Sequence, residues 1–252
     1  MEIKKVTNDL IKWIKDWFDE NGKDCNAIIG ISGGKDSTVM AALCVKALGK
    51  DRVVGVMMPN GEQADISDSI RVCEFLDIPN ITINIKDTVD QEKEAALKAL
   101  KLLGKKELSN QTITNIPPRI RMTTLYAVSQ TMNGRVMNTC NLSEDFVGYS
   151  TRYGDSAGDV SPLANLTVDE VRKIGIELGL PYELVYKTPS DGLCGKTDEV
   201  NLGFTYANLD KYLRTGICKP DIKEKIDKKH KNNKFKMEPM KSFEYGEIKA
   251  EM

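Results

Sequence analysis

The stretch Ala27-Ile28-Ile29-Gly30-Ile31-Ser32-Gly33-Gly34-Lys35-Asp36-Ser37 decides the fold. Residues 27–31 form a short apolar run, which is typical of a buried strand, and helical spacing resumes over residues 37–48. A strand, a glycine-rich turn and a helix in this order predict the first unit of a parallel α/β sheet. Ligands bind beyond the carboxyl ends of the strands in such a sheet, so residues 32–37 lie at the expected binding edge.

Strand-like and helical segments alternate along the rest of the chain. The strand-like segments are residues 53–58, 81–85 and 135–139. The helical segments are residues 3–17, 64–76, 89–103, 118–131 and 167–178. This alternation predicts an open, doubly wound, Rossmann-like parallel sheet with helices on both faces. Weaker strand signals follow Pro181, residues 188–196 are predicted to form a loop, and helices resume at Asp198, before a Lys-rich tail with a solvated helix face.

Length and charge narrow the class of protein. We expect the 252 residues to form a single domain, 1–252, with one good-sized core. Its 36 basic and 37 acidic residues leave a formal net charge of −1, which argues against a general nucleic-acid binder. No stretch has the profile of a signal peptide or a long apolar span, so we expect a cytoplasmic protein without a membrane partner. The six cysteines lack zinc-knuckle or redox-pair spacing and are expected to be reduced thiols.

The glycine-rich turn has the composition of a phosphate-binding loop. Gly33 and Gly34 allow the backbone to approach an anion, while Ser32 and Ser37 add hydroxyl donors. A Walker A motif is excluded, because the residue five before Gly34 is not glycine. Asp36 would be repelled by phosphates unless a divalent cation lay between them, so we expect it to bind Mg²⁺.

Several separated segments accompany this loop. They are Pro59-Asn60-Gly61-Glu62-Gln63, residues 115–122, residues 138–144, residues 148–159 with Pro162-Leu163, residues 188–193, and His230-Lys231. In these segments and the loop the chain resembles the PP-loop family of ATP pyrophosphatases, and within it the ammonia-dependent NAD synthetases. The resemblance runs from the first helix to the Lys-rich tail and implies the adenine nucleotide alpha hydrolase type of fold.

The resemblance also implies the reaction. A ligase of this family uses ATP, with Mg²⁺ as cofactor, to adenylate the nicotinate carboxylate of deamido-NAD. Ammonia then attacks the NAD-adenylate, and the products are NAD, AMP and pyrophosphate. The expected small-molecule partners are therefore ATP, deamido-NAD and ammonia.

Site residues carry over onto matching positions of this chain. The resemblance assigns the metal to Asp36 and Glu144. It assigns ATP contacts to Gly30, Ile31, Ser32, Gly33, Gly34, Lys35, Asp36, Ser37, Gln63, Arg121, Thr139 and Ser190. It assigns deamido-NAD contacts to Asn115, Arg119, Arg152, Asp155, Asp159, His230 and Lys231. The expected catalytic residues are Asp155, Arg152 and Ser190, with Asp155 holding or deprotonating ammonium because an ammonium ion must lose a proton before it can attack.

One position departs from the family pattern. Many members carry a phosphate-contacting lysine where this chain has Val168. Lys35, Lys187 or Lys196 can supply that charge from elsewhere. The resemblance implies that residues 188–193 form a loop that closes over the site, and because Lys187 and Lys196 flank this loop we favour them as ATP contacts. Unchanged kcat/KM for ATP in both Lys187→Ala and Lys196→Ala would contradict that hypothesis.

The remaining predictions concern the oligomeric state, the nitrogen source and the alternative functions of the chain. The resemblance implies a homodimer, and we expect no glutaminase domain, so that free ammonia is the nitrogen source. A separately encoded partner that delivers ammonia stays open. The alternatives are another PP-loop adenylating enzyme, such as a tRNA-thiolating enzyme, and a non-catalytic nucleotide-binding module. Neither paired cysteines nor a basic excess supports the first, and Asp36, Glu144 and Asp155 together weigh against the second.

Overall fold

A four-stranded parallel sheet forms the centre of the molecule. The computed structural model describes residues 2–187, 198–243 and 245. The strands are β1 (Asn26–Gly30), β2 (Val53–Met57), β3 (Asn80–Thr82) and β4 (Gly134–Val136). Their order is β3-β2-β1-β4, and every pair is parallel, with Ile28 of β1 level with Val54 of β2 and Val136 of β4. Because β1 lies between β2 and β4, the chain reverses its direction of winding at β1.

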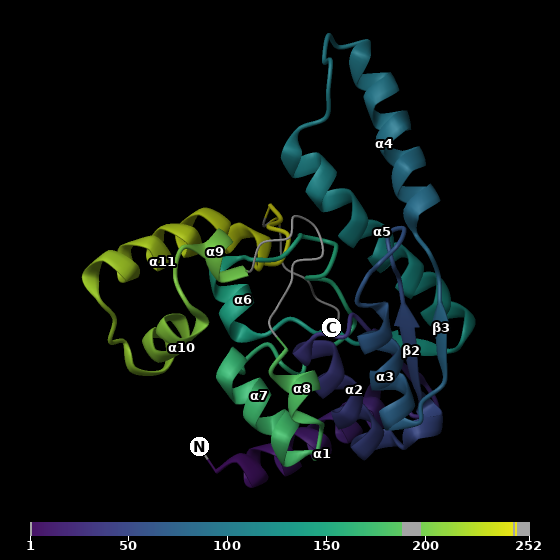
Figure 1. The fold of residues 1–252 in the computed structure, drawn as a ribbon, viewed down its shortest axis with the longest axis vertical. Helices are drawn as coiled ribbons and strands as arrows, with labels where there is room; N and C mark the ends of the chain where they lie inside the picture. Colours follow the sequence, from purple (N-terminus) through teal and green to yellow (C-terminus); the bar gives the residue numbers. More distant parts are fainter. Residues whose placement is uncertain (1, 188–197, 244, 246–252) are drawn as a thin grey trace.

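Helices cover both faces of this sheet, as the sequence predicts (Figure 1). One face packs against α1 (Ile3–Asn21), α2 (Lys35–Leu48), α3 (Ile66–Leu76), α7 (Val168–Glu177) and α8 (Tyr182–Val185). The other face packs against α4 (Lys86–Lys101) and α5 (Asn110–Thr131), with Val89 and Leu125 buried beside Ile28. The predicted doubly wound, Rossmann-like α/β fold is therefore confirmed.

A third apolar cluster lies to one side of the sheet. It joins α6 (Leu142–Val147), α9 (Asp198–Leu202), α10 (Tyr206–Thr215) and α11 (Pro220–Asn233). Within the described ranges, 3₁₀ turns lie at Lys50–Arg52 and Lys234–Lys236. Ile226 of α11 is fully buried in this cluster. The Lys-rich tail is therefore a docked helix that buries part of one face, and only its other faces are solvated.

Two predicted elements differ from the observed ones. After Pro181 the chain forms helix α8, so the predicted strand signals there were wrong. Helix α5 begins at Asn110, well before the predicted start at Pro118, because Ser109 Oγ accepts a hydrogen bond from Thr112 N and caps the helix (3.1 Å). Pro117 and Pro118 lie inside α5, although proline usually marks the start of a helix.

No described helix is both long and apolar enough to cross a membrane. Cys25, Cys44, Cys73, Cys140 and Cys218 are free thiols, and Cys194 lies outside the described residues.

The start of α7 offers a test of the fold. Thr167 Oγ1 accepts a hydrogen bond from Glu170 N, and Glu170 Oε2 accepts one from Thr167 N (2.8 Å), which together make a capping box. Thr167→Ala is expected to lower the free energy of unfolding by about 1 kcal/mol in urea titration, because a helix donor loses its partner. Thr131→Ala, at an exposed position in the last turn of α5, should change it by less than about 0.5 kcal/mol. Equal losses in the two variants would contradict the capping role.

Candidate active site

The glycine-rich loop lies at the carboxyl end of β1, at the switch point between β1 and β4. Ser32 Oγ accepts a hydrogen bond from Gly34 N (3.2 Å) and lies 3.2 Å from Ser37 Oγ. Gly34 is the N-cap residue of α2, and among the described residues no side chain caps this helix. The first amides of α2 are therefore available to an anion, and the helix dipole favours negative charge there.

Gly33 has no room for a side chain. Its φ of +74° is left-handed, and a Cβ atom there would lie 2.9 Å from Asp68 Cβ and 3.0 Å from Ser69 N of α3. Gly33 therefore lets the phosphate loop pack directly against the first turn of α3.

A matched pair of glycines tests this packing. Gly33→Ala is expected to lower the free energy of unfolding by roughly 2–4 kcal/mol and to raise the Kd for ATP, because both backbone strain and a clash arise. Gly179→Ala is the control, since Gly179 has a φ of +79° but no atom within 4 Å of the added Cβ. Strain alone there should cost about 1–2 kcal/mol and leave ATP binding unchanged, as calorimetry can measure. Equal ATP affinity in the two variants would contradict the assigned role of Gly33.

Asp36 and Glu144 come together on one cation, the ammonium of Lys35. Lys35 Nζ lies 2.8 Å from Asp36 Oδ2 and 3.7 Å from Glu144 Oε1. Asn141, which is fully buried, donates to Asp36 Oδ1 (3.0 Å) and accepts from Glu144 N (3.1 Å), so it connects α2 to α6. Asn141 is not among the predicted site residues, although Asn followed three residues later by Glu is an N-cap signature.

The electrostatics of this pair suit a divalent ion. Burial and the neighbouring Asp36 raise the pKa of Glu144, and the Lys35 ammonium opposes that rise. Two carboxylates that share one cation match the donor set of Mg²⁺, which usually binds one or two carboxylates, water and substrate phosphates. No group of three potential metal ligands occurs in the part of the chain that the structure describes. The residues present therefore fit an ion whose remaining ligands come from nucleotide and water.

The acidic loop, residues 148–159, passes over the end of β4. Asp155 Oδ1 accepts a hydrogen bond from Thr151 N (2.8 Å), and burial raises the pKa of Asp155 against these hydrogen bonds and the nearby Arg121. Asn138, another residue missed from the sequence, donates to Asp155 O (2.8 Å) and Ala157 O (3.0 Å). Its Oδ1 also accepts two hydrogen bonds, so this one buried amide fixes the loop beside the strand end.

Helix α5 supplies the opposite wall of the site. Asn115 Oδ1 accepts from Thr151 Oγ1 (2.9 Å), and Arg119 Nε donates to Arg152 O (3.3 Å). Arg121 Nε donates to Met58 O at the end of β2 (3.1 Å). The structure thus brings the predicted residues of α5 together with those of the acidic loop.

Among the predicted deamido-NAD contacts, Asp159 and the tail residue His230 already have close polar contacts within the chain. Asp159 accepts from Tyr126 OH (3.1 Å) and Val136 N (2.7 Å), so both its oxygens already have partners. His230 stacks on Phe146, with ring centroids 4.1 Å apart, and its Nδ1 lies 2.7 Å from Phe146 O. Lys231 is exposed.

Lys236, which sequence reasoning missed, is the tail lysine that reaches the acidic loop. Its Nζ donates to Gly148 O (2.9 Å) and Ser150 O (3.3 Å). In a Lys-rich tail, composition alone does not reveal which lysine docks, because that depends on how α11 packs.

Of the remaining predicted residues, Gln63 and Lys187 contact acidic side chains near the phosphate loop. Gln63 Nε2 donates to Asp65 Oδ1 (2.9 Å), and Lys187 Nζ lies 2.7 Å from Asp65 and 2.5 Å from Asp68. Gly30 ends β1, Ile31 is buried, and Thr139 is half-buried just after β4. Ser190 and Lys196 lie outside the described residues. Val168 is 1% exposed and packs into the third cluster, so a side chain there faces the core.

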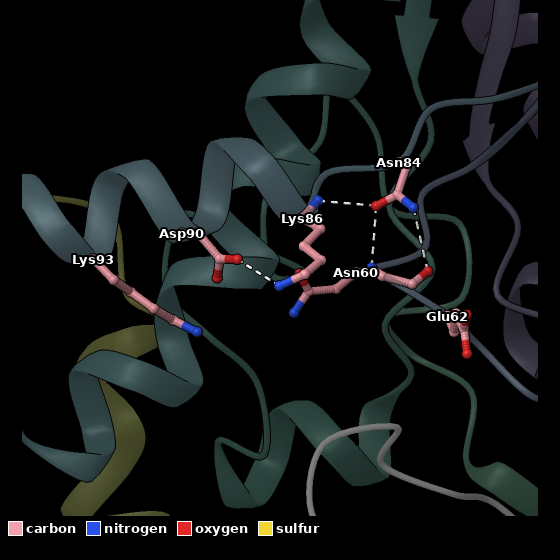
Figure 2. Close-up of a pocket in the computed structure, with 7 residues that line it drawn as sticks. Asn60, Glu62, Asn84, Lys86, Asp90 and Lys93 are labelled. Atoms are coloured by element: carbon pink, nitrogen blue, oxygen red, sulfur yellow. Dashed lines mark hydrogen bonds and ion pairs between the residues drawn. The ribbon is translucent and has the colours of Figure 1, made fainter.

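The described residues form, among others, two hollows near the predicted contacts of α5 and of the segment after β2. Figure 2 shows the larger, of about 650 Å³, between the segment after β2 and the start of α4. Its lining residues are Asn60, Gly61, Glu62, Asn84, Lys86, Asp90 and Lys93. The second, of about 540 Å³, lies between α5 and the acidic loop and is lined by Met122, Thr123, Tyr126, Ala127, Gln130, Tyr153 and Ala157. The second includes Tyr126, whose hydroxyl donates to Asp159, so it borders a predicted substrate contact.

Comparison with known proteins gives consistent matches. The family model described as NAD synthase matches residues 6–245. A protein of Thermococcus sibiricus named NH(3)-dependent NAD(+) synthetase is 40% identical over 215 residues, covering 84% of this chain and 81% of the relative. One of the same name from Finegoldia magna is 37% identical over 249 residues, covering 97% and 98%. The solved structure of NMN synthetase from Francisella tularensis superposes with a TM-score of 0.86 at 31% identity, covering 97% of this chain and 100% of that one.

Proposed function

This chain belongs to the NAD synthase family of ligases, which amidate deamido-NAD, and we propose that it uses free ammonia and proceeds through an NAD-adenylate. One observation supports this most strongly. The phosphate loop, the carboxylate pair of Asp36 and Glu144, and Asp155 of the acidic loop all lie beyond the carboxyl ends of β1 and β4. Adenylation and amine attack need these groups at one site.

In the first step, the nicotinate carboxylate attacks the α-phosphorus of ATP and pyrophosphate leaves. The loop amides and the Ser32 and Ser37 hydroxyls bind phosphate oxygens, with Gln63, Thr139 and Arg121 as further ATP contacts. Asp36 and Glu144 would hold Mg²⁺, which when bound neutralises charge on the phosphates. Lys187 would reach the nucleotide only by leaving Asp65 and Asp68.

In the second step, Asp155 attracts ammonium and accepts its proton. The ammonia so formed attacks the acyl carbon of the adenylate, and AMP leaves with one oxygen of the original carboxylate. Asn115, Arg119 and Arg152 would hold deamido-NAD, since arginine forks suit its phosphate oxygens. Asp159, His230, Lys231 and Ser190 remain proposed contacts, and Asp159 and His230 would bind in addition to the internal hydrogen bonds that they already make.

We also propose a cytoplasmic homodimer. Helix α4 and the start of α5 extend away from the body of the molecule (Figure 1), and Leu102 and Leu103, just after α4, are 89% and 76% exposed. Pairing of these helices with a second copy would bury this apolar surface. Light scattering should give about twice the 28.1 kDa chain mass, and a monomer at micromolar concentration would contradict the proposal.

A second candidate substrate is the mononucleotide. The match with the Francisella tularensis protein named NMN synthetase covers the whole length of that protein, and the two structures superpose with a TM-score of 0.86. The same site chemistry would then amidate the nicotinate carboxylate of a mononucleotide. Initial rates with deamido-NAD and with nicotinate mononucleotide, each with ATP, Mg²⁺ and ammonium chloride, separate the two. We expect the higher kcat/KM with deamido-NAD, and the reverse order would make the mononucleotide the preferred substrate.

A further inference from the structure

Lys35 is a charged side chain buried at the predicted metal site. Its side chain is only 4% exposed, and its ammonium contacts Asp36 and Glu144 at the distances given above. The ring of Tyr206 from α10 lies 5.8 Å from the same ammonium. Lysine is seldom buried this deeply unless its charge is compensated, so the carboxylate pair holds Lys35 in place.

The surroundings of this ammonium are mainly acidic. Asp36 of α2 and Glu144 of α6 act on the Lys35 ammonium, and Arg172 of α7 is a cation that opposes them there. Asp36 and Asp198 of α9 in turn act on the Glu144 carboxylate. Without a cation, Asp36 and Glu144 would face each other as two like charges in a poorly solvated site. The pair therefore requires one positive group, which in this structure is Lys35.

One pair of carboxylates cannot fully serve two cations at once. We propose that Lys35 is an exchangeable counter-ion, whose ammonium neutralises Asp36 and Glu144 in the metal-free protein and is displaced when a divalent cation binds them. This inference rests on the metal site of the proposed function. The displaced ammonium starts from within the phosphate loop, so nucleotide phosphates are the nearest new anion that it can meet.

This exchange also accounts for the missing lysine at Val168. Val168 faces the core, and Lys187 already binds Asp65 and Asp68. Lys35, although buried, lies within the phosphate loop and loses its two anionic partners once metal holds them. Metal and ATP then assist each other, because metal releases the lysine and ATP gives it a partner.

Mn²⁺ binding followed by electron paramagnetic resonance tests the exchange without turnover. In the absence of nucleotide, Lys35→Gln is expected to bind Mn²⁺ about tenfold or more tightly than the unmodified chain, because no ammonium competes for the carboxylates. The same variant should show a raised KM for ATP. Lys46→Gln, an exposed lysine of the same helix, is the matched control and should change neither quantity.

Tighter Mn²⁺ binding together with a raised KM for ATP distinguishes exchange from a structural role of Lys35. If Lys35 only supported the fold, Lys35→Gln would weaken Mn²⁺ and ATP binding together, and Mn²⁺ binding that is unchanged or weaker would overturn the proposal. Lys35→Met provides a second neutral side chain of similar length. A variant that folds only when Mn²⁺ is present supports the exchange, and two variants that stay unfolded with Mn²⁺ overturn it.

Product analysis keeps this inference apart from the proposed function. Failure of the unmodified chain to make NAD would remove the function and leave the Mn²⁺ comparison intact. Normal NAD synthesis with equal Mn²⁺ affinities in the unmodified chain and Lys35→Gln would remove the exchange alone.

Discussion

Replacing Asp36 with asparagine is expected to lower pyrophosphate release roughly 1,000-fold, which corresponds to the several kcal/mol of charge stabilisation that a bound metal supplies. Asparagine keeps the size of the side chain and can still pair with Asn141, so the fold should survive. What is lost is one of the two carboxylates that converge on a single cation. Release of pyrophosphate from ATP and deamido-NAD measures the effect.

Asp169→Asn serves as the control for Asp36→Asn. Asp169 lies on the surface of α7, where its carboxylate pairs with Lys173 and has about half of its side chain exposed. Its pyrophosphate release should match that of the unmodified chain. An Asp36→Asn protein that keeps more than about a tenth of the activity would contradict the assignment of Asp36 to the metal.

Replacing Asp155 with asparagine should affect a different step. We expect kcat/KM for ammonium to fall about 10²–10⁴-fold, the usual contribution of general base catalysis. Adenylation, measured as exchange of labelled pyrophosphate into ATP with deamido-NAD present and ammonium absent, should persist. The acceptor of the Thr151 N hydrogen bond also persists, because asparagine retains one side-chain oxygen.

The pH profile adds a second measurement for Asp155. Only the ionised carboxylate can accept a proton, and burial raises the pKa of Asp155 above its ordinary value. The rate of ammonium use should therefore rise with pH as Asp155 ionises, and this limb should be absent in Asp155→Asn. Equal losses of adenylation and of ammonium use would contradict the assigned role.

The central elements of the fold were predictable because their signals are local. The apolar run of β1, the glycine pair and the helical spacing of α2 are contiguous, and the structure confirms each of them. The predicted ends of strands were less accurate where hydrogen bonding to a neighbouring strand decides them. Residues 81–85 were predicted as a strand and β3 ends at Thr82, yet Ile83 N and Ile85 N still donate to Met57 O and Pro59 O. The segment follows β2 beyond the assigned strand.

The arrangement of charges could not be read from spacing. Lys35 was expected to take part in the phosphate loop, but its burial between Asp36 and Glu144 depends on how α6 and α10 dock against α2. The same holds for Lys236, which follows the docked helix α11 and contacts Gly148 O of the acidic loop. Such contacts join residues far apart in sequence, and no local pattern encodes them.

The most direct test of the account follows an oxygen atom from substrate to product. Deamido-NAD labelled with ¹⁸O at both oxygens of the nicotinate carboxylate should be incubated with ATP, Mg²⁺ and ammonium chloride, and the products analysed by mass spectrometry. Adenylation of the carboxylate predicts NAD with one ¹⁸O, AMP with one ¹⁸O, and unlabelled pyrophosphate. Label in inorganic phosphate together with ADP, or AMP without label, would contradict the adenylate route.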